Sequence, residues 1–341
     1  MNEFLVLTRA IHFGAVLWLF GEFVFFVVVV GPARRRVYSD AYADHRRPER
    51  RLVCVAGGCV AIGIASAFAW LLLEAASMSG TPLTVALNRQ TLETVLRETL
   101  FGRIWTVRLG ISILLCAALL VAWRQRPGRQ GSILQVGGAL LAGAYAASLA
   151  WTGHAAAGSG ADRYVHASCD TVHLLAAGAW IGALPGLSAL FQRVGDAAHP
   201  QRFALAALAA RRFSALGMVT VSALVVTGLV NAWYLVGSLP ALFGTDYGHL
   251  LLWKLLLVAM MVTLAAINRL RLTPRLTMAT PTAVGAPGRD ALTRLRGNTL
   301  LELAGGVAIV GIVAVLGLTM PAAHMLDREH RPSMSPEAHV H

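Results

Sequence analysis

The sequence predicts an all-α polytopic membrane protein: a bundle of eight transmembrane helices with both termini on the extracytoplasmic side. Hydrophobic residues make up 56% of its 341 residues and charged residues 13%, whereas a soluble domain carries about 25% charged residues. Apolar runs of about twenty residues recur along the chain, each long enough to cross a bilayer as a helix. The basic residues cluster in the short segments between these runs.

The eight predicted helices follow the apolar runs in order. They cover residues 4–30, 52–73, 104–123, 132–152, 164–190, 213–236, 249–268 and 298–319. Turn residues end several of them: Gly31-Pro32 ends the first, a Pro-Gly turn follows the third, and Met320-Pro321 follows the eighth. Segment 269–297 is rich in Pro, Thr and Gly, which predicts a flexible linker. Residues 1–319 thus form one transmembrane domain, and residues 320–341 form a tail.

The distribution of arginine predicts the orientation. The loops on one side, residues 31–51, 124–131, 191–212 and 269–297, carry twenty arginines, and the other side carries about eight. Cytoplasmic loops of membrane proteins carry the excess of basic residues. The arginine-rich side is therefore expected to be cytoplasmic, which leaves both termini periplasmic in a cell with two membranes.

Several function classes are disfavoured. The net charge of +12 lies in loops between membrane spans, so we expect no nucleic-acid partner; the bilayer itself is the expected surrounding. The chain has no nucleotide-binding loop, phosphorylated-aspartate motif or CxxC metal gate, which argues against direct use of ATP. We expect no enzymatic activity. Cys54, Cys59 and Cys116 lie in apolar runs and are expected to be small buried residues rather than disulfide partners.

The most informative stretch is the start of the fifth predicted helix. His166, Cys169, Asp170 and His173 fall within about a 100° arc of one helical face. Metal-capable and ionisable side chains are rare on a lipid-facing helix, so this face is expected to look into a polar site.

Most histidines fall on the predicted outer side. His12 lies about 12 Å below the outer end of the first helix, and His173 lies at nearly the same depth. His154 and His166 stand at the outer ends of the fourth and fifth helices. Imidazoles suit copper, and a pair on separate helices would equally hold a b-type haem; spacing leaves both open. We predict His12, His154, His166 and His173 as metal ligands.

Other polar residues are candidates for supporting roles. Cys169 and Asp170 are predicted as auxiliary groups, with Asp170 able to orient an imidazole. Glu22 and Glu302, in the inner half, are candidates for a cation or proton relay, with interhelical hydrogen bonding as the alternative. Lys254 is expected to pair with Asp170 or Glu98, or to extend toward the interface.

The tail carries imidazole and thioether groups, a ligand set suited to copper, with thioether favouring Cu(I). The alternative is a polar tail with incidental residues. The candidate capture residues are His324, Met325, His330, Met334, His339 and His341.

Several motifs together resemble the CopD/PcoD family of copper-resistance membrane proteins. They are TLFGRIWTVR (99–108), WTGHA (151–155), HLLAAGAWIGALPGL (173–187), YGHLLLWKLLL (247–257), AAINRLRLTPRL (265–276) and LLELAGGVAIV (300–310). They occur in the expected order over residues 4–319.

The resemblance implies an inner-membrane protein that moves copper, as Cu(I) or Cu(II), from the periplasm toward the cytoplasm. It implies copper ligation by the four predicted histidines and a periplasmic CopC-like copper-binding partner on a separate chain. A copper sensor without transport and a b-type haem oxidoreductase using the same histidines are the alternatives.

Overall fold

The computed structural model describes residues 2–38, 46–80, 88–124, 129–152, 160–195, 200–278 and 286–323. These residues are helical and include no strand. Eight helical stretches within them are long and apolar enough to cross a membrane, which confirms the predicted all-α fold with eight spans. The stretches are Asn2–Val37, Glu49–Ser79, Leu100–Arg124, Ile133–Thr152, Asp162–Val194, Pro200–Leu235, Asp246–Leu276 and Gly288–Leu316.

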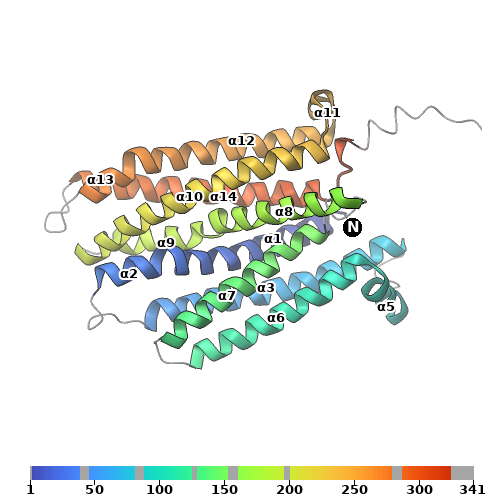
Figure 1. Cartoon of the computed structure of the whole chain (residues 1–341), viewed down its shortest axis with the longest axis horizontal. Helices are drawn as coiled ribbons and strands as arrows, with labels where there is room; N and C mark the ends of the chain where they lie inside the picture. Colours follow the sequence, from blue (N-terminus) through green and yellow to red (C-terminus); the bar gives the residue numbers. More distant parts are fainter. Residues whose placement is uncertain are drawn as a thin grey trace, which may run out of the picture.

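The helices form two groups along the chain (Figure 1). The first group comprises α1 (Asn2–Val24), a π-helical stretch η1 (Phe25–Val30), α2 (Gly31–Val37), α3 (Arg46–Ser79), α5 (Arg89–Glu98), α6 (Leu100–Arg124), α7 (Arg129–Ser148) and a 3₁₀ turn η2 (Leu149–Thr152). The second comprises α8 (Gly160–Ile181), α9 (Leu184–Gly195), α10 (Pro200–Leu235), α11 (Leu239–Gly244), α12 (Asp246–Ile267), a π-helical stretch η4 (Asn268–Leu272), α13 (Thr273–Met278) and α14 (Ala286–Leu316).

Two predicted helix starts and the predicted linker were wrong. Helix α10 begins at Pro200 rather than 213, and α14 begins at Ala286 rather than 298. The chain also remains helical from Asn268 to Met278, within the segment expected to be a flexible linker. The apolar pattern ends where the membrane span ends, but the helix continues because Ala, Leu and Arg are good helix formers in a polar setting too.

Helix α1 lies in the middle of the bundle and packs against α3, α7, α8 and α14 (Figure 1). It therefore contributes to two hydrophobic cores. Leu19 and Phe23 belong to the core shared with α3, α6 and α7. Phe25 and Val29, just beyond its end, belong to the core shared with α9, α10 and α14.

The fifth predicted helix is broken in its middle. Helix α8 ends at Ile181 and α9 begins at Leu184. Pro185 has no N–H to donate to the Ile181 carbonyl, which explains why the helical ladder stops here. The break lies against α1, where a Cβ added to Gly21 would overlap the backbone of Gly182. Small residues thus bring the two backbones into direct contact.

Candidate functional site

His12 is buried between α1, α3 and α7. Its side chain is 0% exposed. The Nδ1 atom lies 3.0 Å from the Ser66 hydroxyl and 3.2 Å from the Gly63 carbonyl oxygen, both on α3. The imidazole ring also meets the edges of two aromatic rings, Trp70 at 5.5 Å and Tyr145 at 5.8 Å between centroids.

The hydrogen bonds around His12 assign its tautomer. The Ser66 hydroxyl donates to the Ile62 carbonyl oxygen at 2.7 Å, so its oxygen is left to accept from the imidazole. A carbonyl oxygen can only accept, so Nδ1 must carry the proton. The other nitrogen, Nε2, is then unprotonated, and it has no hydrogen-bond partner. This is the arrangement of a metal-binding histidine, in which an outer hydrogen bond fixes the ring.

Two arginines flank this region, and sequence reasoning missed both. The guanidinium groups of Arg9 and Arg108 lie 5.1 Å and 5.4 Å from the ring centroid of Trp70. Arg9 is 5% exposed and Arg108 1%. Arg108 donates to the Ser148 hydroxyl, the Ser148 carbonyl oxygen and the Thr152 hydroxyl, each at 2.9 Å. The sequence signal was a charged residue inside an apolar run.

The polar face of α8 packs against α10. His166 stacks on Tyr234 at 4.8 Å, and the Asp170 carboxylate accepts from the Asn231 amide at 3.2 Å. Further along, the Cys169 thiol donates to the Thr227 carbonyl oxygen at 3.6 Å. Nδ1 of His173 lies 2.9 Å from the Thr227 hydroxyl.

His173 has the same hydrogen-bond pattern as His12. The Thr227 hydroxyl donates to the Ala223 carbonyl oxygen of its own helix at 2.6 Å, so its oxygen accepts from His173. The proton is therefore on Nδ1, and Nε2 is the nitrogen left to bind a metal. Two imidazoles in different parts of the bundle are each oriented by a hydroxyl that is itself fixed to its own helix.

Asp170 has a cationic partner on α12. Its carboxylate and the Lys254 ammonium group interact electrostatically, so of the two partners expected for Lys254 it is Asp170 whose charge acts on it. His249, at the start of α12, is different from the other two histidines. Its Nε2 donates to the Phe243 carbonyl oxygen at 2.9 Å, so it has the opposite tautomer, and it lies at an exposed position.

The structure brings only some of the predicted ligands together. His166 and His173 share the α8–α10 interface with Cys169 and Asp170, whereas the contacts of His12 are with α3 and α7. Among the described residues, no three His, Cys, Asp or Glu side chains are grouped so that they could hold a metal ion. His154 lies outside the described residues, and so do the candidate capture residues of the tail, which are His324, Met325, His330, Met334, His339 and His341.

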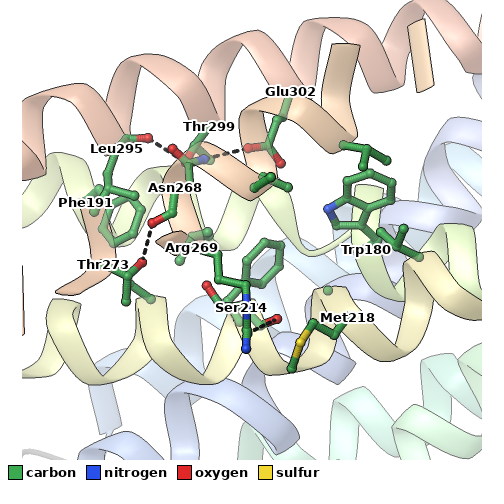
Figure 2. Close-up of a pocket in the computed structure, with 18 residues that line it drawn as sticks. Trp180, Phe191, Ser214, Met218, Asn268, Arg269, Thr273, Leu295, Thr299 and Glu302 are labelled. Carbon is green, nitrogen blue, oxygen red and sulfur yellow. Dashed lines mark hydrogen bonds between the residues drawn. The ribbon is translucent and has the colours of Figure 1, made fainter. Parts of the chain in front are cut away.

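The two candidate relay carboxylates lie apart. Glu22, on α1, is 5% exposed; it interacts electrostatically with Arg51, and a Cβ on Gly186 of α9 would lie 3.0 Å from its Oε2. Glu302, on α14, is 2% exposed and lines a cavity of about 180 Å³ (Figure 2). The Asn268 side-chain amide donates to Glu302 Oε1 at 2.7 Å.

The four cysteines are free thiols, and Cys59 is buried as expected for a small core residue, whereas Cys54 is exposed on the surface of the bundle. None takes part in a disulfide bond. Cys169 is the one that contacts the polar α8–α10 interface.

Comparison with known proteins identifies the family. Residues 1–165 match the family described as copper resistance protein D-like, N-terminal domain, and residues 207–316 match copper resistance protein D. Copper resistance protein D of Pseudomonas syringae pv. tomato is 33% identical over 261 residues, 76% of this chain and 81% of the relative. Inner membrane protein YebZ of Escherichia coli (strain K12) is 29% identical over 313 residues, 92% of this chain and 97% of the relative.

A third relative matches this chain over part of its length. Copper transport protein CutJ of Bacillus subtilis (strain 168) is 31% identical over 182 residues, which are 51% of this chain and 32% of that protein. No solved structure gave a significant match. The first matched region covers the first group of helices and the start of α8, and the second runs from within α10 to the end of α14. The chain belongs to the copper resistance protein D family of membrane proteins.

Proposed function

We propose that this protein binds copper at the outer-half histidines and moves it from the periplasm toward the cytoplasm. The observation that supports this most directly is the shared state of His12 and His173. Each donates its Nδ1–H to a fixed hydroxyl and keeps Nε2 for a metal. Relatives named for copper resistance and copper transport support copper as the ion carried.

The two histidines define two candidate copper-binding positions, the α1 station at His12 and the α8 station at His173, in different electrostatic surroundings. The α8 station includes the Asp170 carboxylate and the Cys169 thiol, and the Lys254 ammonium group offsets the charge of Asp170 and also acts on His173. His12 adjoins Trp70, whose ring is flanked by the guanidinium groups of Arg9 and Arg108, and these positive charges weaken cation binding. In this proposal the α8 station holds copper more tightly than the α1 station, and His154 contributes a fourth imidazole.

The proposal also includes the orientation of the chain in the membrane, capture of the ion by the tail and an inner relay. Both termini face the periplasm of an inner-membrane protein, and the tail His and Met residues capture the ion or receive it from a separate CopC-like protein. Glu22 and Glu302 serve the inner half as relay groups. The protein acts as a carrier and has no enzymatic activity.

Metal analysis of the purified protein tests the binding step. The wild-type protein should retain copper after dialysis, and the double variant His12→Ala/His173→Ala should lose it. His249→Ala is the matched control, because His249 is exposed at the start of α12 and lies outside the predicted ligand set, and it should retain wild-type copper content. Unchanged copper in the double variant would contradict the proposal. A reducible Soret band in the purified protein would instead support a b-type haem.

Copper uptake by proteoliposomes tests the transport step. Vesicles that contain the wild-type protein should accumulate copper faster than vesicles that contain the double variant. Copper binding without uptake would support a sensor rather than a carrier.

A further inference from the structure

The cavity beside Glu302 lies between α9, α10, α12 and α14, and most of its wall is apolar (Figure 2). It is partly open, and it sits at the α13 end of the bundle, away from the chain's N-terminus (Figure 1). Among the described residues that line it, Glu302 and Arg269 are the charged ones. One water molecule needs a cavity volume of roughly 10–15 Å³ on this scale. The cavity of about 180 Å³ therefore has room for several water molecules.

The Glu302 carboxyl group is held by amides rather than by a cation. Asn268 Nδ2 donates to Glu302 Oε1 at 2.7 Å, and Asn298 Nδ2 donates to Asn268 Oδ1 at 2.7 Å. The nearby guanidinium group of Arg269 turns to the Ser214 carbonyl oxygen at 3.4 Å (Figure 2). The chain of two amides fixes Oε1 as an acceptor, and it leaves Oε2 to gain or lose a proton.

Charged groups on the neighbouring elements are occupied elsewhere. On α1, Glu22 interacts with Arg51. On α12, Lys254 interacts with Asp170. The side chains that act on the Glu302 carboxyl group are those of Asn268 and Trp180. A carboxylate charge at this position is therefore not balanced by a direct ion pair within the described residues, and a bound proton removes that charge.

Trp180 supplies a second donor to the Glu302 carboxyl group. The residue is 2% exposed, and its indole N–H acts on that carboxyl group without reaching direct hydrogen-bond geometry. Figure 2 shows the nitrogen-bearing edge of the ring turned toward the other lining residues. A donor and an acceptor separated in this way are commonly bridged by an ordered water molecule.

The backbone near Asn268 is specialised for this arrangement. Residues Asn268–Leu272 form a π-helical stretch at the end of α12. The Thr273 hydroxyl donates to the Asn268 carbonyl oxygen at 2.8 Å, which satisfies a group left free where the α-helical ladder changes. Such π-helical insertions occur frequently at functional sites.

We propose that Glu302 is a proton-exchange site, fed by water in this cavity and separate from the histidine stations. The Glu302 carboxylate takes a proton on Oε2 from a hydronium ion that reaches it through the cavity water, which becomes neutral water, and it later returns the proton to that water, while Asn268 keeps Oε1 oriented in both states. Proton exchange at Glu302 stands independently of copper; its coupling to copper movement rests on the proposed function.

Infrared difference spectroscopy of the purified full-length protein tests proton exchange. Raising the pH should remove a carbonyl band of a protonated carboxylic acid from the wild-type spectrum, and Glu302→Gln should lack that band. Glu22→Gln is the matched control and should keep it. Dicyclohexylcarbodiimide, which reacts with protonated carboxyl groups in apolar surroundings, should label Glu302, and labelling should fall as the pH rises.

Two results would overturn the proposal. One is a band that persists in Glu302→Gln and disappears in Glu22→Gln. The other is labelling of other carboxyl groups of the same sample with none at Glu302. Glu302→Asp keeps a carboxyl group and should show the band. This variant separates loss of the carboxyl group from loss of the fold in Glu302→Gln. These readouts do not require copper, so a protein that moves no copper but shows the Glu302 band disproves the proposed function and leaves the proton site standing.

Discussion

The two groups of helices orient a histidine in the same way but in different electrostatic surroundings. In the first group, His12 is surrounded by Trp70, Tyr145 and two buried arginines. In the second, His173 shares its interface with Asp170, which is balanced by Lys254. The orientation of the imidazole is the same in both, since a serine or threonine hydroxyl fixes Nδ1. The hydroxyl therefore sets the orientation of the imidazole ring, and the surrounding charges set how well that ring holds a cation.

The largest expected effect comes from separating the two groups at their shared helix. Gly21→Leu places a side chain where the backbone of Gly182 lies, and overpacking a rigid contact of this kind costs about 3 kcal/mol or more. We expect loss of the monodisperse peak in size-exclusion chromatography. Gly110→Leu, where a Cβ would meet nothing within 4 Å, is the control and should behave as wild type. A well-folded Gly21→Leu protein would show that the close contact is not required.

The second-largest effect is expected from breaking the electrostatic interaction between Asp170 and Lys254 in the second group of helices. Asp170→Asn leaves the Lys254 ammonium group without its partner, and we expect a loss of about 3 kcal/mol in the free energy of unfolding. Thermal unfolding in detergent measures it. Adding Lys254→Met should restore most of the stability. Independent, additive effects of the two substitutions would show that the pair is not coupled.

A smaller effect is expected for the buried arginine of the first group. Arg108→Lys keeps the charge but loses the forked geometry that reaches Ser148 and Thr152. We expect a loss of about 2 kcal/mol from the unsatisfied acceptors, measured by the same unfolding assay. Arg103→Lys, at an exposed position of the same helix, should leave stability unchanged. Equal stability of Arg108→Lys and Arg103→Lys would argue against a structural role for the Arg108 guanidinium group.

The smallest effect is expected from removing the hydroxyl groups that orient His12 and His173. Ser66→Ala and Thr227→Val each remove the hydroxyl that orients an imidazole. Loss of such an outer hydrogen bond lowers metal affinity about 10-fold, which a competition titration with a copper chelator measures. Thr263→Val removes a hydroxyl that donates only to its own helix and should not change affinity. An effect of Thr227→Val alone would place copper binding in the second group only.

Much of the fold was predictable because apolarity and length are local properties of the chain. The eight spans and the shared face of His166, Cys169, Asp170 and His173 were predicted and are confirmed. The early starts of α10 and α14 were not, because arginine-rich segments remain helical after the apolar pattern ends. The α8–α9 break was not predicted either, although Pro185 was the available signal.

The candidate site was predictable in its residue types but not in its grouping. His12 and His173 were expected to share one site because they lie at similar depth. Depth follows from position along a helix, but the direction of a side chain depends on which neighbour its helix meets. His12 faces α3 and His173 faces α10. Whether His154 joins either of them, and whether the four histidines bind copper, remain predictions.

The sequence by itself determined the class of this protein, its eight spans and its family, because hydrophobic length and motif order are written along the chain. Only the tertiary structure decided which polar groups meet. It placed Ser66 on His12, Thr227 on His173, two guanidinium groups on Trp70 and an amide chain on Glu302. These pairings join residues far apart in the sequence, and helix packing alone fixes them, because in a bundle each side chain contacts whatever the adjacent helix presents at the same depth.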